Sequence, residues 1–265
     1  MVTVALFDHM ETPSRSLIVP ALILALGLVL ATGLFSYAYR EVRKEVRTID
    51  ISGSAEKVVA SDTAKWSLSV SRQADAATLK DTATQLTSDG KAVADYLASN
   101  GIKREEITLQ PPSITPLCDG QGSVSYDRSG NQYCASSRLI GYALQQPMVI
   151  ESSQVEKLTS LSQSAFAVLA ERGIVLTSAG VEYYIRDLNQ VKMQLLSDAT
   201  KNAKDRAEKI LQGTGASIGE LQSASVGVFQ VTAVNSTEIS DYGAYDTAAQ
   251  QKKVTSIVRA SFKLQ

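Results

Sequence analysis

The sequence predicts an α+β protein with mostly antiparallel sheets, three helices packed on them, and one transmembrane helix in front. Three observations predict this class. Residues 16–39 carry no charged side chain, segments with apolar residues at every second position alternate with segments of helical periodicity, and each helical segment ends near a glycine that precedes a strand. The predicted order after the span is β-β-α-β-β-β-α-β-α-β-β.

The first element is the apolar run from Ser16 to Tyr39, which is 24 residues long. A helix needs about 20 apolar residues to cross a bilayer. A cleaved signal peptide has a shorter apolar run of about 7–15 residues and a cleavage site between small residues, and a core helix is rarely apolar on every face. The sequence therefore favours a retained anchor over these two alternatives, and Met10 is an alternative start to Met1.

We divide the chain into a short N-terminal tail (1–15), a transmembrane helix (16–39), a charged stalk (40–47) and a soluble domain (48–265). Two features disagree on the side of the membrane. Four basic residues in the stalk follow the span, which by the positive-inside rule would keep the soluble domain in the cytoplasm. The cysteines indicate the opposite side.

Both cysteines, Cys118 and Cys134, lie in a loop at 117–135 that is rich in Gly, Ser, Asp and Asn. The turn residues 127–130 between two short strand patterns predict a hairpin that would bring the cysteines together. A bridge there would stabilise the fold by about 3 kcal/mol in the chain-entropy model. Disulfides form in oxidising compartments, and the alternative is two unrelated thiols.

The soluble domain begins with strand patterns at 49–53 and 63–70, where Trp66 is predicted to be a core residue. The helices are predicted at about 75–99, at about 153–172 with a capping box of Ser153 and Glu156, and after Asp187. Strands are predicted after each helix. They cover 107–110, 181–185 and 221–231, and a last strand runs over 254–264.

Several of these segments, in this order, resemble the SIMPL-domain family, whose members include periplasmic and outer-membrane-associated bacterial immunogenic proteins. The segments with this resemblance are an opening strand with Gly53, a Gly-Tyr pair that opens a strand (Gly141 and Tyr142), and a helix rich in Lys and Arg with alanines at 199, 203 and 207. The resemblance covers residues 48–265. It implies an envelope protein that faces the periplasm, assembles into a large ring-like or channel-like homo-oligomer and is associated with oxidative or envelope stress. It carries over no catalytic residue.

The composition excludes several chemistries. The net charge is −1, with 26 basic and 27 acidic residues and no basic cluster outside the stalk, so no nucleic-acid partner is expected. The single histidine, His9, precedes the span, which removes histidine-dependent catalysis and histidine-ligated metal from the soluble domain. We therefore expect no catalytic, cofactor-binding or metal-binding residues, and no enzyme.

A segment at 233–250 lacks helical and strand periodicity and carries Tyr242 and Tyr245. Loops of this length are commonly functional or disordered. We expect a flexible loop, with the two tyrosines as candidates for an interface between subunits and a merely mobile loop as the alternative.

Three functions remain, in order of preference. The first is a protein anchored in the bacterial inner membrane through residues 16–39, single-pass, with its C-terminal domain in the periplasm, that binds copies of itself and supports tolerance of envelope and oxidative stress. The second is an accessory binding module for another membrane protein or a periplasmic ligand. The third is an enzyme, which the missing motifs argue against.

Overall fold

The computed structural model describes residues 15–42, 47–120, 124–135 and 137–265. The tail at 1–14, which includes His9 and Met10, lies outside the described residues. So do residues 43–46 of the predicted stalk and residues 121–123 of the predicted cysteine loop.

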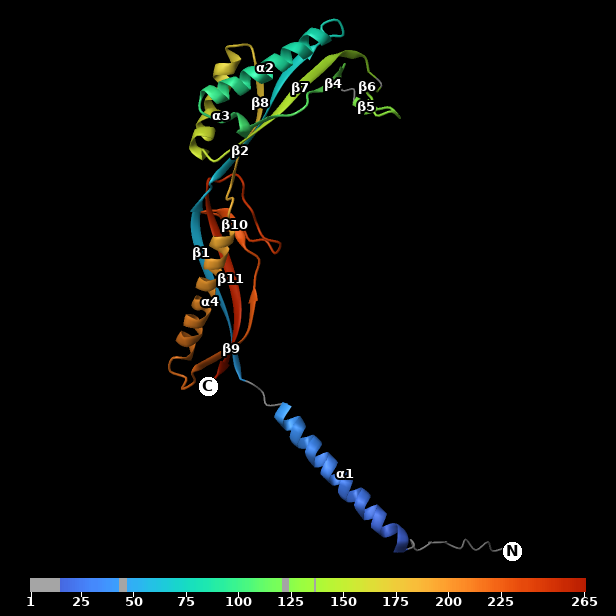
Figure 1. The fold of residues 1–265 in the computed structure, drawn as a ribbon, viewed down its shortest axis with the longest axis vertical. Helices are drawn as coiled ribbons and strands as arrows, with labels where there is room; N and C mark the ends of the chain where they lie inside the picture. Colours follow the sequence, from blue (N-terminus) through green and yellow to red (C-terminus); the bar gives the residue numbers. More distant parts are fainter. Residues whose placement is uncertain (1–14, 43–46, 121–123, 136) are drawn as a thin grey trace, which may run out of the picture.

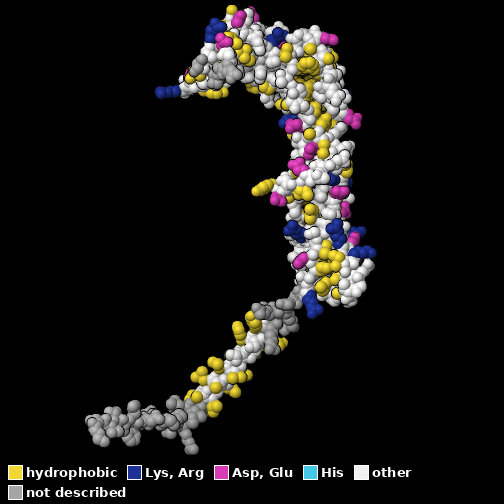
Figure 2. All heavy atoms as spheres, turned by 180° about the vertical axis from the view of Figure 1, so that it is seen from behind, with side chains coloured by type: hydrophobic (Ala, Val, Ile, Leu, Met, Phe, Trp, Pro, Cys, Tyr) yellow, Lys and Arg dark blue, Asp and Glu magenta, His cyan; other side chains and the backbone are white. Residues whose placement is uncertain are grey.

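Helix α1 (Arg15–Val42) contains the predicted span. Its segment Val19–Tyr39 is long and apolar enough to cross a membrane, and every residue of this segment is exposed. Figure 1 shows α1 extending away from the rest of the chain, with no layer of protein around it. Hydrophobic side chains lie on the surface of the helix (Figure 2). A signal sequence near an N-terminus has the same length and composition, so this helix is compatible with a single-pass anchor and equally with a signal sequence.

The remaining elements form two lobes that follow one another along the long axis of the molecule (Figure 1). The lobe next to α1, here called the proximal lobe, has a four-stranded antiparallel sheet in the order β1-β11-β10, with β9 pairing to β11 beside β10. Helix α4 packs on one face of this sheet, against β1 and β11. The elements are β1 (Thr48–Ala60), α4 (Asn189–Leu211), β9 (Ile218–Val226), β10 (Gln230–Ala233) and β11 (Gln251–Leu264).

The second lobe, here called the distal lobe, has a five-stranded antiparallel sheet in the order β3-β7-β2-β8, with β4 also pairing to β7. Two helices, α2 and α3, cover one of its faces. The elements are β2 (Thr63–Ala74), α2 (Leu79–Ser99), the 3-10 turn η1 (Arg104–Glu106), β3 (Ile107–Leu109), β4 (Ser113–Cys118), β7 (Leu139–Ser152), α3 (Val155–Ala170) and β8 (Val175–Tyr184). The predicted α+β class is thus confirmed.

The predicted hairpin in the cysteine loop is confirmed. Strands β5 (Val124–Tyr126) and β6 (Gln132–Cys134) pair in antiparallel register around a turn in which the Asp127 carboxylate accepts hydrogen bonds from the Ser129 and Asn131 N–H groups. These bonds lower the pKa of Asp127. A disulfide joins Cys118 at the end of β4 to Cys134, with 5.6 Å between their Cα atoms. The bridge therefore fastens the hairpin to the end of the distal sheet.

Two of the segments that carry the family resemblance, the opening strand and the alanine-rich helix, meet in the proximal lobe. A Cβ atom on Gly53 would lie 2.1 Å from the Ala199 carbonyl oxygen and 2.4 Å from the Ala203 nitrogen. Only a glycine therefore allows α4 to approach β1 this closely. Ala199, Ala203 and Ala207 are fully buried on the same face of α4, because small side chains are all that this spacing accommodates.

Several predicted boundaries shift. Helix α2 begins at Leu79 instead of near 75, because the Asp75 carboxylate binds the N–H and hydroxyl of Thr78 in a preceding turn. The predicted capping box of α3 is wrong, since the N-cap residue is Gln154 and it makes no side-chain cap bond. Instead, the Ser152 hydroxyl accepts the Gln154 N–H.

The single strand predicted at 221–231 is two strands, β9 and β10. Gly227 lies in the break between them, where its N–H binds the Ile257 carbonyl. The predicted glycine after each helix is confirmed: Gly101, Gly173 and Gly213 all have positive φ angles, which a residue without Cβ adopts at little cost.

Candidate functional site

The segment between β10 and β11, predicted as a flexible loop, fastens the two lobes to each other. Its Tyr245 forms a bridge with Val231 of β10, and its hydroxyl accepts a hydrogen bond of 3.1 Å from the Ile185 N–H at the end of the distal sheet. The Tyr245 ring also stacks on Tyr184, with 6.1 Å between the ring centroids. Thr247 then accepts the Tyr183 N–H. This segment therefore touches both lobes.

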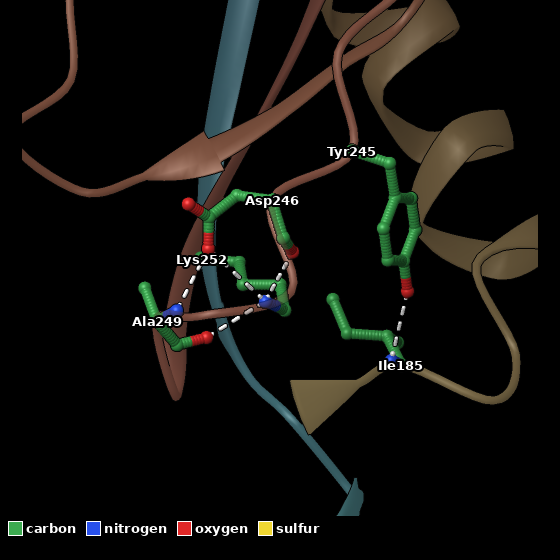
Figure 3. A network of polar contacts seen from close by, with 5 residues as sticks. All are labelled: Ile185, Tyr245, Asp246, Ala249 and Lys252. Atoms are coloured by element: carbon green, nitrogen blue, oxygen red, sulfur yellow. Dashed lines mark hydrogen bonds and ion pairs between the residues drawn. The ribbon is translucent and has the colours of Figure 1, made fainter. Parts of the chain in front are cut away.

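Lys252 of β11 forms hydrogen bonds with the same segment (Figure 3). The side chain is 0% exposed. Its ammonium donates hydrogen bonds to the backbone carbonyls of Asp246 and Ala249, and it lies 3.5 Å from the Asp246 carboxylate. That carboxylate also accepts the Ala249 N–H. Loss of hydration lowers the pKa of Lys252, and the Asp246 charge opposes this effect. We call Tyr245, Asp246, Ala249 and Lys252 the clasp.

The strands that connect the lobes are bonded to each other at the same level. Asp62, between β1 and β2, donates its N–H to the Tyr184 carbonyl and accepts the Arg186 N–H on its carboxylate at 2.9 Å. The Ser61 N–H binds the carbonyl of Gln250, the last residue of the segment between β10 and β11. The chain passes between the lobes twice, at 61–62 and at 185–188, so these bonds fix the two crossings together.

A hollow of about 430 Å³ lies beside this junction, on the face of the distal sheet that α2 and α3 leave open. We call it the junction pocket. On its floor Lys65 of β2 is the register partner of both Glu151 on β7 and Glu182 on β8, and its ammonium lies 3.8 Å from Glu182. Residues of the pocket lining are Thr63, Lys65, Glu151, Tyr184, Ile185 and Arg186.

The electrostatics of the pocket are mixed. Burial raises the pKa of Tyr184, and the charges of Glu182 and Glu151 raise it further. The Lys65 ammonium has an ion-pair partner, whereas within the described ranges the side chains of Glu151 and Arg186 have neither a hydrogen-bond nor an ion-pair partner. The pocket therefore presents one unpaired charge of each sign beside an aromatic ring.

The two outer edges of the proximal sheet differ. On β1, the Asn202 side chain of α4 accepts the Ser54 N–H, and the Arg206 guanidinium donates to the Ser52 carbonyl. These two bonds occupy backbone groups that would otherwise attract another strand. On β9, every residue from Glu220 to Val226 is exposed, and no described strand pairs with its outer side.

The predicted site residues fall into two groups. Cys118 and Cys134 form the predicted disulfide. Tyr245 and Tyr242 have different environments. Tyr245 belongs to the clasp, whereas Tyr242 is 98% exposed. Their assignment to an interface between subunits stays a prediction. In the part of the chain that the structure describes, no group of three His, Cys, Asp or Glu side chains is placed to hold a metal ion, and the expected absence of metal and cofactor also stays a prediction.

Sequence reasoning missed the clasp and the junction pocket. One signal for Lys252 was present, because it falls in the two-residue alternation of the buried positions Val254, Ser256 and Val258. A lysine in such a position needs polar partners inside the fold. The pocket had no comparable signal, since its lining comes from three strands and a connection that lie far apart in the sequence.

The comparisons with known proteins agree with the segments that carry the resemblance. Residues 49–262 match the family described as "SIMPL: Protein of unknown function (DUF541)". No curated protein matches the chain. The matched range spans both lobes from the start of β1 to the end of β11. The chain therefore belongs to the SIMPL family.

Proposed function

We propose that this protein is a non-enzymatic protein of the bacterial inner membrane, anchored by α1 with both lobes in the periplasm. In this proposal it assembles with copies of itself into a ring-like or channel-like oligomer and supports tolerance of envelope and oxidative stress. The ring and the stress role come from the resemblance to the family. The observation that carries the assembly is the open edge of β9.

Strand β9 has the properties that natural edge strands avoid. Glu220 is its only charged residue, and it contains neither proline nor lysine. Leu221 and Val226, 48% and 54% exposed, are the register partners of Phe262 and Val258 on β11. Another chain could pair with the free backbone groups and cover these side chains in one contact.

The contrast with β1 bears on the symmetry of the assembly. Asn202 and Arg206 occupy part of the outer edge of β1. We therefore expect β9 of one subunit to contact a surface of its neighbour other than the β1 edge. A contact between two different surfaces closes into a ring when its rotation allows. An anchor on every subunit would require all copies to stand in the same direction on the membrane, which a cyclic ring satisfies.

The periplasmic location is supported by the disulfide between Cys118 and Cys134. A reporter that is active in only one compartment, fused after Gln265, tests it. Activity in the periplasm is expected. Activity in the cytoplasm would contradict both the location and the formation of the disulfide in the cell.

The assembly is tested with the full chain in detergent, by light scattering coupled to size-exclusion chromatography and by negative-stain imaging. We expect a mass of many subunits and ring-shaped particles. The double variant Ala224→Lys/Val226→Lys places two charges at exposed positions of β9 and is expected to give monomers. Met193→Lys, at an exposed position on α4, is the matched control and should leave the oligomer intact. A wild-type chain that is monomeric would refute the proposal.

The second candidate function is an accessory binding module for a periplasmic ligand or another membrane protein. The observation that favours it is the junction pocket, a hollow lined by charged and aromatic side chains on the distal sheet beside the junction of the lobes. A monomeric wild-type chain would favour this role.

A further inference from the structure

We propose that the junction pocket binds a small zwitterion that carries an ammonium and a carboxylate group, such as a free amino acid or a dipeptide. This inference rests on the binding-module role and does not require the assembly.

The pocket has the volume for such a ligand. Its 430 Å³ fall within the range of about 300–1,000 Å³ that small-molecule sites occupy. It lies at the end of the distal lobe that faces the junction, since Thr63, Lys65 and Glu151 come from the distal sheet and Arg186 from the connection that leads to α4.

Arg186 supplies the group that would bind the carboxylate. Its backbone N–H is held by the Asp62 carboxylate, so the start of the side chain has a fixed position. Its guanidinium has no partner among the described residues. A planar guanidinium binds a carboxylate through two parallel hydrogen bonds, which gives both strength and orientation.

Glu151 supplies the group that would bind the ammonium. It is exposed, it lies on β7 directly beside Lys65, and Lys65 is paired with Glu182 on the other side. Among the described residues the Glu151 carboxylate has no partner. The ring of Tyr184, which lines the same pocket, offers a second favourable surface for a cation.

A ligand with a single charge would satisfy only one of these groups. The two unpaired charges have opposite sign and line one pocket, yet no ion pair joins them across the described residues. A zwitterion neutralises both at once. Because the site is open to water and exposed ion pairs are weak, we expect a dissociation constant of about 1 mM.

The test is isothermal titration of the full chain in detergent with glycylglycine, which carries both charges. N-acetylglycine, with only the carboxylate, and methylamine, with only the ammonium, are the matched probes. We expect glycylglycine to bind at least about tenfold more tightly than either. Absence of binding by glycylglycine, or equal binding by one of the single-charge probes, would overturn the proposal.

Two variants locate the site. Arg186→Gln and Glu151→Gln should each weaken glycylglycine binding about tenfold, because each removes one charged contact. Arg172→Gln and Glu156→Gln change the same residue types at exposed positions outside the pocket and should leave binding unchanged. Equal melting temperatures by circular dichroism show that the variants are folded. Binding by a chain that light scattering shows to be monomeric would refute the assembly and support this site, so the two proposals fail separately.

Discussion

The two lobes are built on the same plan, a sheet with helices on one face, yet they fill their cores in opposite ways. The distal core is filled by large side chains, with Trp66, Leu86, Leu97, Met148 and Leu158 almost completely buried. The proximal lobe has small clusters under α4, where alanines and Gly53 bring backbones together. Large side chains keep a helix and a sheet apart and fill the space between them, whereas small ones let the two approach.

The lobes also bury charge differently. In the distal lobe, the buried carboxylate of Asp89 on α2 forms an ion pair with Arg72 of β2 and accepts a hydrogen bond from Gln85. In the proximal lobe, Lys252 is bonded mainly to backbone carbonyls of the clasp segment. The first arrangement links helix α2 to strand β2 of its own sheet. The second links β11 to a connection that also contacts the distal lobe.

The largest effect should come from emptying the distal core. Trp66→Ala removes a side chain that is 1% exposed and a 2.7 Å hydrogen bond from its indole N–H to the Ser178 hydroxyl. We expect a loss of about 4 kcal/mol in the free energy of unfolding, because the cavity cannot collapse fully. The measurement is urea unfolding of the full chain in detergent, followed by circular dichroism because Trp66 is the only tryptophan.

The control for this prediction is Trp66→Phe, which keeps most of the volume and should cost clearly less than the alanine. Hydrogen exchange gives the second readout, since amides of the distal sheet should lose more protection than those of β1 and β11. A loss below about 1 kcal/mol for Trp66→Ala would show that the distal core does not depend on large side chains.

These two modes of packing explain how much of the fold the sequence predicted. Apolar periodicity located the helices and the long strands, and Trp66 was correctly expected in the core, because burial of large side chains leaves a regular pattern. The boundaries of the elements were harder to predict. The break at Gly227 and the start of α2 at Leu79 depend on one or two local hydrogen bonds that periodicity does not record.

The candidate site was less predictable than the fold. The disulfide followed from two cysteines around a turn. The clasp and the junction pocket could not be derived. Glu151 and Tyr184 come together only through the pairing of β7 and β8 with β2, and Lys252 contacts a connection that has no periodic pattern. Arg186 is placed by a hydrogen bond to Asp62, more than a hundred residues earlier.

The second effect tests close packing in the proximal lobe. Gly53→Ala would place a Cβ atom against the backbone of Ala199 and Ala203, which cannot rotate away. We expect a loss of about 3 kcal/mol in the free energy of unfolding, at the upper end for an overpacked core, because α4 must move off β1. The same urea titration measures it.

Ser52→Ala is the matched control, since Ser52 lies one position along β1 and is exposed. It should change the unfolding free energy by less than about 0.5 kcal/mol. If Gly53→Ala were equally mild, the small residues of α4 would not be required for close approach, and the contrast between the lobes would be wrong.

The smallest effect concerns the clasp, where Lys252→Met keeps the length of the buried chain and removes its charge. The carbonyls of Asp246 and Ala249 lose their donor, so we expect a loss of about 2 kcal/mol at pH 7. Lys253→Met is the control, because Lys253 makes a single long bond of 3.3 Å to the Ser236 carbonyl.

The pH dependence of this difference separates the charge of Lys252 from its shape. The pKa of Lys252 in the folded protein lies below 10.5, so between that lowered pKa and 10.5 the unfolded chain binds more protons at this site than the folded one. Stability contributed by Lys252 must therefore rise as the pH increases through this window and fall as it decreases. We expect the gap between the wild type and Lys252→Met in urea titrations to widen from pH 7 toward pH 10. A gap that narrows over this range would mean that Asp246 and the backbone carbonyls of the clasp stabilise the ammonium by more than burial destabilises it, which would contradict the lowered pKa of Lys252.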